Sequence, residues 1–200
     1  MRRTLPRSTK RGASLLEAII ALTVTALLLG NIAMVQSATG DAYESSVFGS
    51  NLEDKADTTM DRIALAIMST SIDRLDEVLN APSFVSSIDY EVVTDVVDGE
   101  PIIGTPERIQ FDVGDSKVVW VRDPDTPDAT EVVWTKHVPM LLEGEEPDAV
   151  DNNGNGIADE QGLNFSAKQN QITVHLTLTR TDSRGTEYTR TVSRRVTCRN

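Results

Sequence analysis

Cysteine and histidine are scarce in this chain. There is 1 cysteine, Cys198, so no internal disulfide can form and folding does not depend on one. The 2 histidines, His137 and His175, are not spaced with other ligands in a way that predicts a zinc site. The Gly-x-Ser-x-Gly and P-loop motifs are also absent. We therefore expect a protein that is not an enzyme.

Basic residues are outnumbered by acidic ones. The chain has 19 lysines and arginines against 31 aspartates and glutamates, which gives a formal net charge of −12. Basic side chains cluster at the very start, at Arg2, Arg3, Arg7, Lys10 and Arg11. The remaining chain is strongly acidic, which argues against a nucleic-acid partner because such binding needs a basic surface. An acidic domain instead suits a location outside the cytoplasm and attracts cations.

A long apolar run follows the basic segment directly. Ala18–Val35 is apolar apart from a few threonine, glycine and asparagine positions. As a helix it would cover about 27 Å, just enough for the hydrocarbon core of a bilayer. The basic residues before it keep the N-terminus in the cytoplasm. Glu17 stands at the start of this run, and charge at the centre of a bilayer costs about 2.5–3.5 kcal/mol, so this carboxylate needs a partner.

The segment Lys10–Glu17 and the apolar run resemble the type IV prepilin signal of pilins and type II secretion pseudopilins. The resemblance implies a leader at residues 1–12, which a prepilin peptidase cleaves after Gly12. Ala13 then becomes the new, N-methylated terminus, although the family more often has phenylalanine there. Glu17 is implied to neutralise the terminal amine of a neighbouring subunit, because opposite charges at low dielectric are tolerated only as a pair.

Two simpler interpretations of the N-terminal segment stay open. A secretory signal peptide has basic, apolar and cleavage regions in this order, with Val35-Gln36-Ser37 as a poor cleavage site. An uncleaved membrane anchor would also need the apolar run. Neither interpretation explains Glu17 or the position of Gly12 directly before the apolar segment.

The chain after the leader divides into three expected parts. We expect a transmembrane or filament-core helix over 13–36, an amphipathic helical part over 37–80, and a β-rich globular head over 81–200. Gly49 is a point where the long helix could be interrupted, and a short helix is expected over 72–79. Apolar residues recur at spacings of three and four, which predicts a buried helical stripe. They are Leu52, Ala56, Met60, Ile63 and Ile67.

The head has the composition of antiparallel strands. Segments rich in β-branched and aromatic residues are 90–97, 108–113, 117–122 and 131–138, and Gly114–Ser116 predicts a hairpin turn. Trp120 and Trp134 are expected to pack in the core or an interface. The clearest alternation places Ile172, Val174, Leu176 and Leu178 on one face, followed by a partner strand over 186–198. The fold class is therefore α+β, with a pilin-like long N-terminal helix packed on an antiparallel β-sheet head.

The acidic loop 148–160 contains a series that resembles the D-x-[DN]-x-[DN]-G calcium loop of EF-hands, dockerins and thrombospondin type 3 repeats. The resemblance implies a structural Ca²⁺ bound by side-chain oxygens and one carbonyl. The residues implied are Asp151, Asn153, Asn155, Ile157, Asp159 and Glu160. Gly162 stands where an EF-hand has a bidentate glutamate, so Glu160 or Asp148 would have to substitute. The alternative is a turn that only links two strands.

Within the superfamily the chain most resembles a type II secretion minor pseudopilin of the J type, by its short leader, the Met60–Ile63 helical segment and the basic late strands that Arg199-Asn200 close. The implied function is a non-enzymatic subunit of a pseudopilus or pilus-like filament in the bacterial inner membrane, with a single span and the head outside the cytoplasm. The implied partners are prepilin peptidase and other pilin or pseudopilin subunits. The alternative is a membrane-anchored calcium-binding or adhesive module that does not polymerise.

Overall fold

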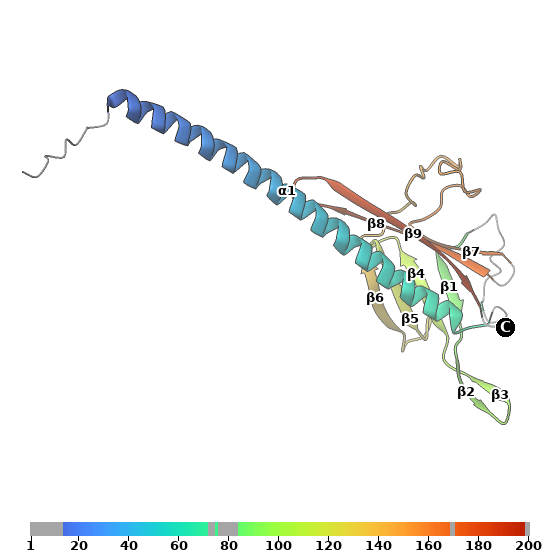
Figure 1. Cartoon of the computed structure of the whole chain (residues 1–200). Coiled ribbons are helices and arrows are strands. Elements are labelled where there is room, and N and C mark those ends of the chain that lie inside the picture. The colour runs from blue at the N-terminus through green and yellow to red at the C-terminus, as the bar shows by residue number, and fades with distance from the viewer. Residues whose placement is uncertain (1–13, 72–74, 76–83, 169–170, 199–200) are drawn as a thin grey trace, which may run out of the picture. The chain divides into compact units, whose positions relative to one another are not determined.

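A computed structural model describes residues 14–71, 75, 84–168 and 171–198 (Figure 1). The chain divides into two compact units, Met1–Ser46 and Val47–Asn200. A single helix, α1 (Leu15–Met68), is the one element that belongs to both units. The expectation of one long helix is confirmed, and the helix is not interrupted at Gly49, where the sequence allowed a break. A glycine inside a long helix weakens it without necessarily breaking it.

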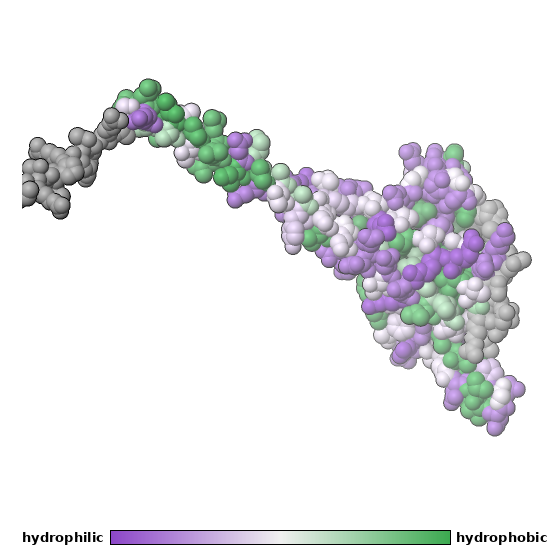
Figure 2. All heavy atoms as spheres, in the orientation of Figure 1, coloured by the Kyte–Doolittle hydropathy of each residue, from purple (hydrophilic) through white to green (hydrophobic). Residues whose placement is uncertain are grey.

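The first unit consists, in its described part, of the N-terminal half of α1. Its best apolar window has a mean hydropathy of 2.3 and is 0% buried, so this helix is a candidate single membrane span (Figure 2). Its polar side chains bond within the helix: Thr23 and Thr25 each donate to the carbonyl four residues earlier at 2.8 Å, and Asn31 does so at 3.0 Å. Polar groups satisfied in this way are compatible with a surrounding free of water.

The second half of α1 belongs to the head and buries the predicted stripe. Ile63 and Ala56 are 0% exposed, and Met60 and Ile67 are 1% exposed. They join one apolar cluster with residues of the head's strands. The helical periodicity of this segment therefore predicted its buried face correctly.

The described strands form three antiparallel sheets (Figure 1). The first has the order β1-β4-β5-β6, the second pairs β2 with β3, and the third has the order β7-β8-β9. The bounds are β1 Ser87–Tyr90, β2 Val93–Val97, β3 Glu100–Ile103, β4 Glu107–Asp112, β5 Lys117–Arg122, β6 Thr130–Lys136, β7 Leu163–Lys168, β8 Gln171–Thr181 and β9 Glu187–Thr197. The predicted α+β class, with one long N-terminal helix followed by antiparallel sheets, is confirmed.

The late strands match their prediction closely. The alternate residues of β8, from Ile172 to Leu178, are 0% exposed on the face that joins the apolar cluster. On the other face, Thr177 is also 0% exposed because it bonds to Thr191 of β9 and to the backbone N–H of Glu143. The predicted polar face of β8 is thus partly covered by Glu143, which precedes the acidic loop 148–160 in the sequence.

The expected strand over 90–97 is wrong as a single element. β1 ends at Tyr90, and β2 turns back onto β3 through Asp98-Gly99, whose φ angles are 53° and 87°. Positive φ at both central residues is the signature of a tight hairpin turn, and Asp-Gly is among its preferred sequences. Of the expected helix over 72–79, only Leu75 is described, and it forms an antiparallel bridge with Tyr90. The remaining residues of that segment lie outside the described residues.

The two larger sheets share one core. Val85, just before β1, exchanges two backbone hydrogen bonds with Phe165 of β7, at 3.0 and 2.8 Å.

Trp120 and Trp134 are partly buried against the core, as expected. The indole N–H of Trp120 donates to Glu107 Oε2 at 2.9 Å, and the hydroxyl of Tyr90 donates to the same oxygen at 2.7 Å. Burial together with this carboxylate raises the pKa of Tyr90 above its usual value, so the hydroxyl stays protonated.

Ile63→Ala is expected to lower the free energy of unfolding of the head by about 2–5 kcal/mol, because it leaves a cavity in a fully buried position. Leu65→Ala is the matched control, since Leu65 is 67% exposed on the same helix. Urea unfolding of the full-length protein in detergent micelles, followed by tryptophan fluorescence, measures both. Equal losses in the two variants would contradict burial of the stripe.

Candidate functional site

The N-terminal motif is only partly described. Gly12 and Ala13, the expected processing residues, lie outside the described residues. Glu17 lies in the first turn of α1, as expected from the start of the apolar run. Of the three expected residues Gly12, Ala13 and Glu17, Glu17 is the one whose contacts can be stated.

Glu17 forms a reciprocal cap with Ser14. The carboxylate Oε2 accepts the backbone N–H of Ser14 at 2.8 Å, and the hydroxyl of Ser14 accepts the backbone N–H of Glu17 at 3.2 Å. This arrangement is the capping box of a Ser-x-x-Glu sequence, which satisfies two otherwise unpaired N–H groups at a helix start. The sequence interpretation considered only the charge of Glu17. The Ser14-x-x-Glu17 spacing was the signal that would have revealed the cap.

The second candidate site is the acidic loop between Leu142 and Gln161. Its turn is organised by Asp151, whose Oδ1 accepts the N–H groups of Gly154 and Asn155 at 2.7 and 3.1 Å. Oδ2 of Asp151 accepts the N–H of Gly156 at 2.7 Å. Gly154 and Gly156 have φ angles of 76° and 97°, a region that other residues rarely adopt. The expected sharp turn is therefore present.

The side chains of Asn153 and Asn155 converge on Glu160. Each amide nitrogen donates to Glu160 Oε2, Asn153 at 3.3 Å and Asn155 at closer range. Their carbonyl oxygens accept the backbone N–H groups two residues later, from Asn155 at 3.0 Å and from Ile157 at 2.9 Å. Three of the expected ligands, Asn153, Asn155 and Glu160, thus lie around one point.

Asp159, an expected ligand, accepts hydrogen bonds at the base of the loop. Its carboxylate accepts the backbone N–H groups of Asp148 and Ala149, at distances of 3.0 to 3.1 Å. These bonds close the loop across its base. Glu145, which sequence reasoning missed, accepts the N–H of Asn153 at 3.1 Å and that of Asp159 at 3.0 Å, although it is only 8% exposed. No spacing rule points to Glu145, because its partners are 8 and 14 residues away.

Glu160 is the most unusual side chain in the loop. It is 0% exposed, and its Oε1 atom is buried without a hydrogen-bond partner. Among the described residues, no lysine or arginine forms an ion pair with it. Burial lowers the pKa of nearby His175, while the Glu160 carboxylate acts in the opposite direction. His175 is therefore mostly neutral near pH 7 and does not compensate the carboxylate.

The departure from the EF-hand pattern at Gly162 has a steric cause. A Cβ atom at this position would lie 2.2 Å from the carbonyl oxygen of Pro139, far inside contact distance. No glutamate can therefore stand there without moving the backbone. Within the described residues, no group of three histidine, cysteine, aspartate or glutamate side chains is arranged to hold a metal ion. Any site in this loop must accordingly rely on amide and carbonyl oxygens as well as on Glu160.

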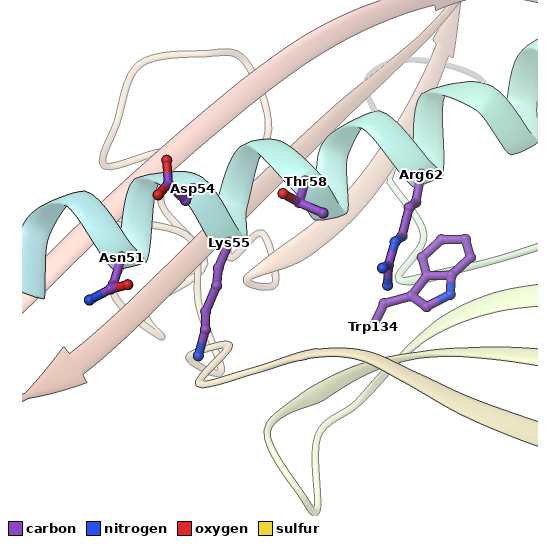
Figure 3. A pocket seen from close by; sticks show the side chains of 6 residues that line it. All are labelled: Asn51, Asp54, Lys55, Thr58, Arg62 and Trp134. Atoms are coloured by element: carbon purple, nitrogen blue, oxygen red, sulfur yellow. The ribbon is translucent and has the colours of Figure 1, made fainter.

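The described residues of the head line two grooves of interest. One, of about 680 Å³, is lined by Asn155–Ile157 and by residues of β7, β8 and β9, including His175 and Arg195. The other, of about 200 Å³, lies between α1 and β6, where Arg62 and Trp134 lie close together and Lys55 points toward the strands (Figure 3). In the larger groove, Ser193 of β9 lies directly opposite His175 of β8, and no hydrogen bond joins these two described side chains.

Comparisons with known proteins leave the family open. No protein-family model, no curated protein and no solved structure matches this chain.

Proposed function

We propose that this chain is a non-enzymatic subunit of a type II secretion pseudopilus or type IV pilus-like filament. Prepilin peptidase cleaves it after Gly12 at the inner membrane, and it assembles with other pilin or pseudopilin subunits through the N-terminal half of α1. The head then lies outside the cytoplasm. The observation that carries the proposal is a helix whose apolar start is 0% buried by the described residues. It begins with a carboxylate, and a basic segment that ends in glycine precedes it in the sequence.

The exposed apolar side chains support this proposal. Leu15 is 81% exposed, Leu22 is 73% exposed and Met34 is 74% exposed. Burying one such side chain contributes about 1.5–3 kcal/mol, so a helix of this kind needs an apolar environment. Lipid supplies that environment to the precursor. In a filament, the same surface is covered by the corresponding helices of neighbouring subunits.

The charge of Glu17 fits the same picture. A carboxylate can accept about four hydrogen bonds, and the bond to Ser14 N–H uses one of these sites. The carboxylate therefore keeps the capacity to bind an amine from a neighbouring subunit. Such a pair is favourable in a low-dielectric surrounding, whereas either charge alone is costly there.

The alternative is a membrane-anchored module, calcium-binding or adhesive, that does not polymerise. The capping box favours it, because Glu17 already has a local partner that explains its presence. The two functions differ in what they require of residue 17. A cap requires only a hydrogen-bond acceptor, whereas pairing with an amine requires a negative charge.

Three variants separate these requirements in a cell that carries the matching assembly machinery. Glu17→Gln keeps an acceptor for the cap and removes the charge, Glu17→Ala removes both, and Ser14→Ala keeps the charge. For a filament subunit we expect both Glu17 variants to lower incorporation into sheared filaments about tenfold or more, since an unpaired buried amine costs several kcal/mol. Ser14→Ala should incorporate nearly normally. Immunoblots of the sheared fraction measure this, and protease accessibility confirms insertion.

Normal incorporation of Glu17→Gln together with loss in Ser14→Ala and Glu17→Ala would assign the residue to capping alone. Absence of the wild-type chain from filaments, with normal insertion, would favour the anchored module.

The site of processing gives a second test. The intact mass of the chain purified from membranes should correspond to a start at Ala13 with one added methyl group. A Gly12→Ala or Gly12→Leu substitution should leave the precursor uncleaved, because the peptidase reads this glycine. A start at Met1 in the wild type would support an uncleaved anchor, and a start at Ala38 would support a secretory signal peptide.

A further inference from the structure

We infer that the loop Glu145–Glu160 binds one Ca²⁺ ion, with the buried carboxylate of Glu160 as its main charged ligand, and that this ion stabilises the head. The inference does not depend on the proposed assembly function, because it concerns the head alone. It also differs from an EF-hand, in which the last charged ligand stands at the twelfth position.

The first argument is the unpartnered oxygen of Glu160. Its side chain is 0% exposed, and Oε1 has no hydrogen-bond partner among the described residues. A buried carboxylate without a compensating charge is strongly unfavourable, and it is retained when a cation or a proton neutralises it. The side-chain amides of Asn153 and Asn155 lie next to this carboxylate, and amide carbonyl oxygens are ligands of a hard metal ion, which favours the cation.

The second argument is the convergence of ligands. Asn153 and Asn155 approach Glu160 Oε2 from alternate positions of the turn. The carbonyl oxygen of each asparagine accepts one backbone N–H and keeps a second lone pair that can bind a cation. Oδ2 of Asp151 accepts a single N–H, from Gly156, and so retains a free lone pair. Amide, carbonyl and carboxylate oxygens in a flexible number are the ligand set that Ca²⁺ prefers over Mg²⁺.

The third argument is that the loop backbone is already shaped. Glu145 holds the N–H groups of Asn153 and Asp159, while Asp159 holds those of Asp148 and Ala149. The ion therefore does not have to order the whole turn and needs only to bind the converging oxygens. With two carboxylates and neutral amides, the affinity should fall in the range of extracellular modules, about 10⁻⁴–10⁻³ M.

The site is coupled to the core of the head through its backbone. The carbonyl of Glu160 accepts the N–H of Leu142 at 2.7 Å, and Leu142 is 5% exposed. The next residue, Glu143, donates its N–H to Thr177 of β8 at 3.3 Å and accepts the hydroxyl of Thr191 of β9 at 2.6 Å. An ion that fixes Glu160 thus also fixes the contacts of the loop with both strands.

The test uses the full-length protein in detergent micelles, stripped with EDTA and titrated with CaCl₂. We expect the melting temperature of the head to rise with Ca²⁺ and to saturate in the millimolar range, with a smaller rise for MgCl₂. In Glu160→Gln the rise should disappear, while the melting temperature in EDTA stays equal to or above that of the wild type, because the uncompensated charge is gone. Glu146→Gln is the control: this residue is exposed in the same loop, and its response should match the wild type.

Asn155→Ala provides a second variant if Glu160→Gln does not fold. It keeps every charge and removes one ligand, so the apparent dissociation constant should increase about tenfold, which corresponds to about 1.4 kcal/mol. Direct calorimetric titration measures this constant. The inference would be overturned if the melting temperature did not rise up to about 10⁻² M Ca²⁺, roughly ten times above the expected range. An equal rise in the wild type, Glu160→Gln and Asn155→Ala would also overturn it, because it would indicate diffuse binding to an acidic surface.

Discussion

Ile63, Met60 and Ala56 on one stripe of α1 are buried in the same apolar cluster as the strands of the head. The four-stranded sheet contributes Ile109 and Val118 to this cluster, and β8 contributes its alternating residues. An antiparallel sheet is stable in water when one of its faces is covered. In this protein the apolar stripe of α1 forms part of that cover. Because the apolar stripe of α1 is buried here, the opposite side of the helix and the acidic loop can carry charge. The arrangement of the acidic loop on β8 and β9 in turn depends on those strands being held in place.

The parts of the fold that the sequence predicted are those in which local pattern and burial agree. β8 alternates strictly, and every apolar member is buried, so its prediction needed no tertiary information. The prediction of a single strand over 90–97 failed because residues that favour strands lie on both sides of Glu91-Val92. The backbone leaves one sheet before these two residues and enters another sheet after them. β7 was not anticipated, since Asn164 is fully buried beside Leu163 and Phe165 and hides the alternation. The composition of a segment predicts that it forms a strand, but the partner of that strand is determined by residues far away in the sequence.

The acidic loop shows the same division between local and distant information. The spacing of Asp151, Asn153 and Asn155 located the turn correctly, because each side chain bonds to a backbone group a few residues away. Spacing could not reveal Glu145, which reaches across the loop, or the contact of Gly162 with Pro139 that excludes a glutamate there. Once that position is closed, Glu160 is the acid that the converging amides can reach. The steric requirement of one glycine thus determines which carboxylate faces the centre of the loop.

The cap at the start of α1 changes how the charge of Glu17 should be understood. Its carboxylate bonds to the N–H of Ser14, one peptide bond from Ala13. If processing frees the amine of Ala13 as proposed, that amine is attached beside the cap and is available to the carboxylate of its own chain. An intrachain pair would let the processed helix wait in the bilayer without two isolated charges. Assembly would then exchange this pair for one between subunits. In the proposed filament, covering the exposed leucines and isoleucines of α1 would supply apolar burial, and the charge of Glu17 would select the register in which the helices meet.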